Sequence, residues 1–450
     1  MKNIREYLKE NEESMLEVLA KLVSFPSVNE TNSAYPFGEA NALCLDYALK
    51  LCEDLKMKTK NLDYYIGYGE IGAGKELIGV IGHLDVVPVG GNWNTDPFKM
   101  EIKDNKAYGR GTSDDKGPLV SALFAFKYLL DNEVELNKRL RIVFGCNEES
   151  GFKCVEHYVE KEGHFDYGFT PDGPFPCCFG ESGIIKLQFS APNKVFEKIS
   201  GGMASNVVPD NCEMTLDAKD IDQEELIEYL EISGIKEYAL VEEAGKLRFQ
   251  VSGKAAHAST PEEGVNAISF ALTALVKGGL NDPAIMEFAG KINTEYNGES
   301  CGVNLQDEYR ELTLNVGKIW LKDDNINFEV DIRCPFTFEN AEVIDSLSKE
   351  FINWQVAALS DSPGLYQPED SPFVKILVDT YKEVTGKDDK PLTMGGGTYA
   401  RGVNNTLAFG ADYQDDENTN IHDANEFIKI ENLLQNTEIY ITALLKLLEL

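Results

Sequence analysis

Five short motifs rich in histidine and carboxylate side chains are spread along the chain. They are His83-Leu84-Asp85, Asp114-Asp115, Glu148-Glu149, the single Asp172, and His422 within residues 421–426. Imidazole nitrogens and carboxylate oxygens hold divalent ions in hydrolytic sites, where one coordination position stays open for water. Together these residue types supply what a hydrolase with two metal ions needs.

The pair His83 and Asp85 directly follows an apolar run at residues 77–82. Side chains two residues apart on a strand point to the same face. Asp85 is therefore expected to hold one imidazole nitrogen of His83 while the other nitrogen binds metal. Taken alone, the pair is also compatible with a hydrogen-bonded strand end.

Asp114 and Asp115 lie in a turn flanked by Gly111 and Gly117. Glycine and aspartate are common turn residues, so a solvated turn is one interpretation. A carboxylate that bridges two ions about 3.5–4 Å apart needs a backbone that permits close approach, and the flanking glycines provide it. Both interpretations remain open for this motif by itself.

Glu148 and Glu149 follow a second apolar run, at residues 140–145. Adjacent side chains in extended structure point in opposite directions, so one carboxylate can bind metal while the other acts as general base. A solvated pair at a strand end is the alternative, and Asp172 or His422 alone indicates little. Taken together, the motifs are not explained by chance placement. Three of the five histidines, at positions 83, 257 and 422, lie in glycine, proline or acidic contexts.

The elements around these motifs predict an α/β domain. The runs at 77–82 and 140–145 are typical of buried parallel strands, and residues 14–23 and 119–126 have helical spacing. This alternation favours a parallel sheet covered by helices. Residues at the carboxyl ends of such strands meet in one crevice, so distant motifs can share one pocket.

In the middle of the chain, the pattern of apolar and polar residues changes. Strict alternation at 185–189 and 213–217 predicts half-exposed strands, and a helix is expected at 223–230. A similar order returns with a strand at 326–333 and a helix at 340–351, which indicates a duplicated α+β insert. Helical spacing resumes at 374–385. The predicted domains are residues 1–180 and 371–450 together, with 181–370 inserted.

Composition excludes several classes of protein. The 450 residues carry 42 basic and 76 acidic side chains, a formal net charge of −34, which repels nucleic acid and anionic membrane surfaces. Residues 1–7 lack the apolar core of a signal peptide, and no apolar run is long enough to cross a bilayer. Nine cysteines without paired spacing are expected to be reduced and buried. We expect a soluble cytoplasmic protein.

In combination, the motifs from His83 to Asn425 resemble those of the M20 metallopeptidases, most closely the PepV-like dipeptidases of bacteria. The resemblance implies a three-layer α/β/α zinc-peptidase-like catalytic domain and a ferredoxin-like lid. It also implies a dinuclear zinc site, with Mn or Co as other possible ions. The implied ligands are His83, Asp114 and Asp172 for one ion and Asp114, Glu149 and His422 for the other, with a cis peptide bond between Asp114 and Asp115.

The resemblance implies further roles beyond the metal ligands. They are Glu148 as general base, Asp85 as the residue that orients His83, His257 as donor to the oxyanion, Asn206 as a second lid contact, Arg333 as the clamp on the substrate carboxylate, and Gly396, Gly397 and Thr398 as a loop whose amides hold the carboxyl terminus. The loop at 395–401 lacks the Lys-Ser/Thr ending of a P-loop, so nucleotide binding is not favoured.

The leading hypothesis is a metal-dependent dipeptidase that acts on small peptides with a free carboxylate. The alternatives are a deacylase of N-acyl amino acids or N-succinyl-diaminopimelate, and a noncatalytic metal-binding protein. In the family that the chain resembles, many members have a short lid that dimerises, whereas this insert of about 190 residues is predicted to be doubled. We therefore expect a monomer in which His257 acts in its own chain, with lid closure assembling the site.

Overall fold

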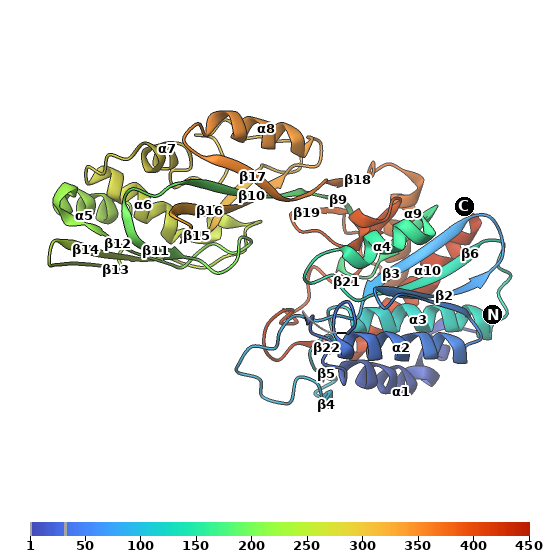
Figure 1. The fold of residues 1–450 in the computed structure, drawn as a ribbon. Helices are drawn as coiled ribbons and strands as arrows, with labels where there is room; N and C mark the ends of the chain where they lie inside the picture. Colours follow the sequence, from blue (N-terminus) through green and yellow to red (C-terminus); the bar gives the residue numbers. More distant parts are fainter. Residues whose placement is uncertain (1, 31–33) are drawn as a thin grey trace. The chain divides into compact units, whose positions relative to one another are not determined.

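The computed structural model describes residues 2–30 and 34–450, which form two compact units (Figure 1). Unit 1 comprises Met1–Phe179, Gln367–Leu392 and Gly397–Leu450. Unit 2 comprises Gly180–Tyr366 and Thr393–Gly396. Each unit has its own sheet and its own buried core, so each is described by itself.

Unit 1 is built on a mixed sheet with parallel strands at its centre. Its strand order is β1 (Lys58–Leu62), β2 (Ile66–Gly72), β6 (Arg139–Gly145), β3 (Leu77–His83), β7 (Tyr167–Thr170), β20 (Thr406–Ala408) and β9 (Cys178–Glu181). The strands β6, β3, β7 and β20 are mutually parallel, whereas β1 and β2 run antiparallel at one edge. The carboxyl ends of the parallel strands therefore lie along the same edge of the sheet.

Helices cover both faces of this sheet. They are α1 (Ile4–Val23), α2 (Glu39–Asp54), α3 (Lys116–Asp131), α4 (Lys153–Glu162), α9 (Pro372–Thr385) and α10 (Ile430–Glu449). Gly69 of β2 faces α2 so closely that a Cβ there would lie 2.7 Å from the Cys52 sulfur. The next side chain back, Tyr68, points the other way and contacts Tyr158 of α4. This alternation along β2 produces the predicted three layers.

Short elements complete unit 1. A three-stranded sheet contains β4 (Glu101–Lys103), β5 (Lys106–Tyr108) and β22 (Phe427–Lys429), and a two-stranded ladder pairs β8 (Gly173–Pro174) with β21 (Ala411–Asp412). The helix α9 shows clear end signals. The Ser371 side chain accepts a hydrogen bond from Val374 N at its start, and Gly386 follows its end with a φ of 74°.

Unit 2 contains an antiparallel eight-stranded sheet. Its order is β13 (Tyr238–Glu243), β14 (Lys246–Ser252), β12 (Asn211–Asp217), β11 (Phe196–Gly201), β15 (Thr313–Lys322), β16 (Asn325–Cys334), β10 (Gly183–Pro192) and β17 (Gln355–Ser362). The pairing of β11 with β15 joins two four-stranded halves. The short strands β18 (Leu365–Tyr366) and β19 (Leu392–Met394) pair with β9. The doubled insert predicted from the sequence is thus one continuous sheet.

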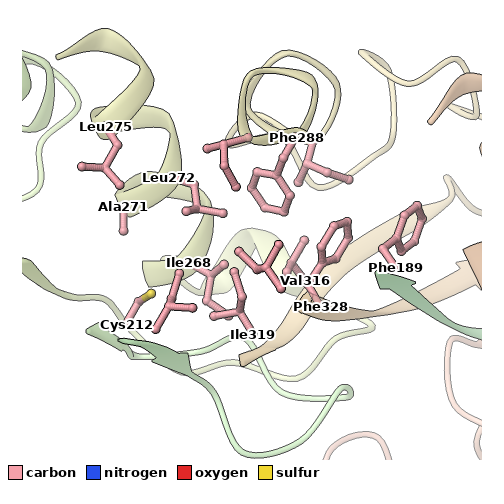
Figure 2. Close-up of a cluster of buried hydrophobic side chains, with 14 of the residues drawn as sticks. Phe189, Cys212, Ile268, Ala271, Leu272, Leu275, Phe288, Val316, Ile319 and Phe328 are labelled. Carbon is pink, nitrogen blue, oxygen red and sulfur yellow. The ribbon is translucent and has the colours of Figure 1, made fainter. Parts of the chain in front are cut away.

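The helices of unit 2 lie on one face of its sheet (Figure 1). They are α5 (Gln223–Ile232), α6 (Ala267–Lys277), α7 (Pro283–Lys291) and α8 (Asn340–Glu350). Figure 2 shows the resulting core, where Ile268 and Leu272 of α6 point toward Ile319 and Val316 on β15. Because strand side chains alternate, the opposite face of these strands is free to carry polar residues.

The segment Thr393–Gly396 belongs to a different unit from the one predicted. The sequence pattern groups these residues with the segment 371–450 of the first domain, whereas the structure groups them with unit 2. Main-chain contacts explain the difference, because Ser182 N donates to Met394 O at 3.0 Å and Arg333 Nη1 donates to Gly395 O at 3.0 Å. Sequence periodicity carries no signal for such contacts.

All nine cysteines are buried, as predicted. In the described part of the chain, no helix is both long and apolar enough to span a bilayer.

Candidate metal centre

Three of the predicted site motifs lie at the carboxyl ends of neighbouring parallel strands of unit 1. His83 is the last residue of β3, Glu148 lies just beyond the end of β6, and Asp172 lies just beyond the end of β7. Because these strands are parallel and adjacent, their ends meet at one edge of the sheet. Asp114 precedes α3, and His422 lies in the loop that leads to β22.

Asp114 occupies the middle of this group. Its Oδ1 lies 2.9 Å from His83 Nε2, and its Oδ2 lies 2.9 Å from His422 Nε2. Each carboxylate oxygen thus faces a different imidazole, an arrangement that suits a carboxylate shared by two ions. The Asp114–Asp115 peptide bond is cis, as the resemblance implied.

The remaining carboxylates surround the two histidines. Glu149 Oε2 lies 3.2 Å from His422 Nε2, and Asp172 Oδ2 lies 3.8 Å from His83 Nε2. Two groups have ligand atoms within 4.8 Å of one another: His83, Asp114 and Glu149, and His83, Glu148 and Asp172. The structure therefore brings the predicted ligands of unit 1 together, and it places Glu148 among them.

Asp85 corrects one detail of the sequence interpretation. His83 Nδ1 donates to the main-chain carbonyl of Asp85 at 2.9 Å, while the Asp85 carboxylate is 3.6 Å from that nitrogen. The carboxylate instead accepts the main-chain N–H groups of Glu148, at 3.0 Å, and Glu149, at 3.2 Å. The loop conformation thus gives the carbonyl to His83 and leaves the carboxylate to hold the glutamate pair.

This hydrogen bond also settles which imidazole nitrogen of His83 is available. A carbonyl oxygen can only accept, so Nδ1 carries the proton and donates it to Asp85. In a neutral imidazole, Nε2 then has the free lone pair, and Nε2 is the atom that faces Asp114. A carbonyl that fixes the tautomer in this way is typical of histidines that bind metal.

Several carboxyl groups of the cluster are buried close together, which shifts their pKa values. Desolvation, together with the negative charge of Asp114, raises the pKa of Asp172 to about 8. Desolvation and the nearby Asp172 likewise raise the pKa of Glu148 well above its usual value. These carboxylates disfavour one another's ionised forms, and a cation bound between them would relieve that repulsion.

The pKa of Asp114 is shifted in the opposite direction from those of Asp172 and Glu148. Burial raises the pKa of Asp114, but the hydrogen bonds from His422 and His83 outweigh it and hold that pKa below its usual value. The hydrogen bonds from His422 to Asp114 and Glu149 raise the pKa of His422. Protons on the imidazoles occupy the positions that a divalent cation would take, since both neutralise the same carboxylates.

The residues present fit two divalent cations. The donor set consists of imidazole nitrogens and carboxylate oxygens, which suits zinc and also manganese or cobalt. A bridging geometry is available at Asp114, and the carboxylates of Glu149 and Asp172 lie near the two histidines. The site therefore has the chemical character of a dinuclear hydrolytic centre.

Unit 2 contains His257 and Asn206, which local contacts hold side by side. A β-bridge joins His257 to Val207, and Ala258 N donates to Asn206 O at 3.0 Å. Asn315 of β15 supports the same loop, because its Nδ2 donates to the carbonyls of Ser205 and Val207. The side chain of Ser259 lies 2.7 Å from His257 Nδ1. Residues that are distant in sequence thus form one loop pair at the end of β15.

Arg333 is buried on β16 and held by its neighbours. Its Nε donates to Asp331 Oδ1 at 2.6 Å, and its Nη1 donates to Gly395 O at 3.0 Å. The guanidinium also retains N–H groups beyond these bonds, since arginine has five. Asp331 therefore orients Arg333 without using all of its donors.

The glycine-rich loop is divided between the units. Gly396 belongs to unit 2, whereas Gly397 and Thr398 belong to unit 1. Thr398 is buried, and its hydroxyl accepts a hydrogen bond from Ala400 N at 3.1 Å. A Cβ on Gly397 would lie 2.3 Å from the Arg401 guanidinium. A larger residue at this position would displace the end of the Arg401 side chain.

Several buried residues near the ligands were given no role in the sequence analysis. Tyr399 contacts the ring of His83 edge-on, and its hydroxyl lies 2.9 Å from Cys154 Sγ. Asp115 accepts a hydrogen bond from His83 N at 3.1 Å. Arg110 and Glu426 form a buried ion pair. Asp115 and Glu426 lie inside the sequence motifs Asp114-Asp115 and 421–426, so their position was the available signal.

Residues 79–446 match the sequence profile of peptidase family M20/M25/M40. The chain belongs to this family. Its members are peptidases, so the chain is a hydrolytic metallopeptidase, and the cluster at Asp114 is a candidate site for its metal ions.

The relatives and solved structures agree with this family. "Putative dipeptidase SSP1012" of Staphylococcus saprophyticus is 34% identical and covers 98% of this chain and 99% of its own length. "Putative dipeptidase YtjP" of Bacillus subtilis is 34% identical and covers 92% of each chain. Structures of human carnosine dipeptidase 1 (TM-score 0.61, 15% identity, covering 99% of each chain) and of the Saccharomyces cerevisiae di-peptidase Dug1p (TM-score 0.62, 15% identity, covering 99% of this chain and 98% of Dug1p) share the fold. The predicted fold class and family are confirmed.

Proposed function

We propose that the protein is a dipeptidase with a dinuclear metal centre, which hydrolyses the peptide bond of dipeptides that have a free carboxyl terminus. The observation that carries the proposal is the bridging geometry of Asp114, whose two oxygens each lie 2.9 Å from a different histidine. Relatives with 34% identity over at least 92% of the chain are named as dipeptidases, which favours this substrate class over others in the family.

The proposed ligand sets are those that the family resemblance implies, and the contacts of Asp114, Glu149 and Asp172 with the two histidines support them. One ion would be held by His83, Asp114 and Asp172, and the other by Asp114, Glu149 and His422. Zinc is the proposed metal, with manganese and cobalt compatible with the same donors. When bound, the ions would act as Lewis acids that polarise the scissile carbonyl and make the attacking water more acidic.

Glu148 is the proposed general base. Its carboxylate would accept a proton from the attacking water as the new C–O bond forms, and would pass that proton to the amine as the C–N bond breaks. Its carboxylate is grouped with His83 and Asp172, so a proton acceptor at this position would lie beside the proposed ligands. Asp85 supports this role through the loop, because it holds the main-chain N–H of Glu148.

The residues of unit 2 are proposed to bind the substrate. His257 would donate a hydrogen bond to the oxyanion, Asn206 would provide a second contact, and Arg333 would bind the free carboxylate. The amides of Gly396, Gly397 and Thr398 are proposed to hold the same carboxyl terminus. Asp331 favours the assignment of Arg333 because it fixes the guanidinium before substrate arrives.

We also propose that the protein is a monomer and that His257 acts in its own chain. The doubled sheet of unit 2 supports this, because its two halves pair through β11 and β15 within one chain. Mixing a His257→Ala variant with a Glu148→Ala variant is expected to restore no activity, and sedimentation is expected to give a single 50.0 kDa species. A dimer whose mixed variants regain activity would contradict both statements.

The test of the proposed function is hydrolysis of a small panel by chelator-treated protein with zinc or manganese restored. The panel contains Ala-Ala, β-Ala-His, the tripeptide Ala-Ala-Ala and N-succinyl-diaminopimelate. Metal-dependent cleavage of the dipeptides is expected, with little cleavage of the tripeptide or the acylated substrate. Cleavage of N-succinyl-diaminopimelate alone would replace the dipeptidase assignment with a deacylase and leave the metal centre unchanged.

A further inference from the structure

A buried ion pair in unit 1 contacts the backbone of two proposed metal ligands, Asp114 and His422. Arg110 Nη1 donates to Glu426 Oε2 at 2.7 Å, and the two side chains are only 2% and 1% exposed. Neither residue belongs to the groups of ligand atoms around His83. The pair is electrically neutral, so it adds no net charge that would attract a cation.

Glu426 uses its carboxylate to hold the loop that carries Asp114. It accepts the main-chain N–H groups of Gly111 at 3.0 Å, Ser113 at 2.9 Å and Asp114 itself at 3.2 Å. Its own main-chain carbonyl accepts Gly109 N at 3.0 Å. Gly111 has a φ of 86°, a conformation that lets the loop curl around a single acceptor. One side chain thus fixes the backbone that immediately precedes the bridging carboxylate.

Arg110 extends the same network to His422. Its Nη2 donates to the main-chain carbonyl of His422 at 3.2 Å, and its guanidinium lies 5.3 Å from the ring centre of Trp93. His422 has a φ of 66°, so its backbone needs support in a conformation that few side chains favour. Arg110 and Glu426 together connect the segments that carry Asp114 and His422, whose facing atoms are 2.9 Å apart.

A gain in folding stability is not enough to explain why an ion pair is buried at this place. Taking two charges out of water is costly, and well-packed apolar residues often replace a buried ion pair without loss of stability. Here, however, the donors and acceptors converge on the backbone of two residues that must keep a fixed spacing. Partners placed behind metal ligands typically change metal affinity by about 10–100-fold when they are altered.

We infer that Glu426 and Arg110 are positioning residues that hold Asp114 and His422 at the spacing required to bind a metal ion between them. The inference rests on the proposed metal centre, since it assigns these two residues as ligands. It predicts that Glu426→Gln weakens metal binding although the substituted side chain never touches the ion.

Glu70 offers a matched control in the same unit. It accepts Arg141 Nε at 3.0 Å and Nη2 at 2.7 Å, between β2 and β6, and the Arg141 side chain is only 4% exposed. The change Glu70→Gln is chemically the same as Glu426→Gln, next to another buried arginine. Any general effect of neutralising a buried pair therefore appears in both variants.

The experiment measures zinc affinity by competition with a chromogenic chelator, alongside thermal unfolding of the chelator-treated proteins. The Glu426→Gln variant is expected to bind at least one ion about 10–100-fold more weakly than wild type, and Glu70→Gln to stay within about twofold. Activity of the Glu426→Gln variant is expected to recover when zinc is raised in proportion to the lost affinity.

Other results would overturn the inference. Wild-type affinity in Glu426→Gln, or an equal loss in both variants, would show that the pair does not position ligands. If Glu426→Gln shows no cooperative unfolding, Arg110→Lys is measured in the same way, and wild-type zinc affinity there would overturn the inference. A wild-type protein that binds no ion would instead refute the proposed metal centre, and the inference with it.

Discussion

Replacing Glu148 with glutamine is expected to lower kcat by about 100- to 10,000-fold while leaving the metal content at the wild-type level. Glutamine has nearly the same size as glutamate but cannot accept the proton of the attacking water. Glu148 is not part of the proposed ligand sets, so the ions should remain bound. Steady-state hydrolysis of Ala-Ala and metal analysis of the purified variant measure the two quantities.

The neighbouring glutamate provides the control for this substitution. Glu149 Oε2 lies 3.2 Å from His422 Nε2, where a shared ion would lie close to both. Glu149→Gln is therefore expected to lose metal, and some of its activity should return at high zinc concentration. A Glu148→Gln variant that loses metal, or that keeps full activity, would contradict the role of general base. The first of these results would make Glu148 a ligand, as its position near His83 and Asp172 permits.

Sequence patterns were sufficient to predict the elements that carry the site. The buried run at 77–82 became β3, and the run at 140–145 became β6, because parallel strands covered on both faces are apolar throughout. The ends of such strands meet at one edge, so local periodicity and topology rules were enough to expect His83 and Glu148 near each other. Asp172 was assigned as a ligand only through the family resemblance, because no strand was predicted before it.

The contacts behind the ligands could not be predicted in this way. The sequence suggested that the Asp85 carboxylate holds His83, but the loop after β3 turns so that the carbonyl of Asp85 takes that place. Glu426 was quoted only as the end of a motif, because its partners lie more than 300 positions away in the chain. Main-chain acceptors and long-range pairs leave no pattern in a single sequence, although they fix the ligand geometry.

Replacing Asp114 with asparagine is expected to have the broadest effect on the metal centre. The two oxygens of Asp114 each lie 2.9 Å from a different histidine, and asparagine offers one oxygen and one N–H group instead. One side of the bridge is lost, and the charge that balances the ions falls. We expect metal content to fall from two ions to one or none, and activity to fall by at least about 100-fold, since altering even outer partners costs about 10–100-fold.

The adjacent Asp115→Asn variant separates this bridging role from a general disturbance of the loop. Asp115 is fully buried and accepts His83 N through Oδ2, and burial raises its pKa well above the usual value. Asparagine keeps a side-chain oxygen that can accept the same hydrogen bond from His83 N, so Asp115→Asn should retain two ions and most of its activity. Metal analysis of both variants provides the comparison. Two bound ions in Asp114→Asn would refute the proposed bridge. Asparagine has a single side-chain oxygen, so the two ions could not each be held by a separate oxygen of residue 114.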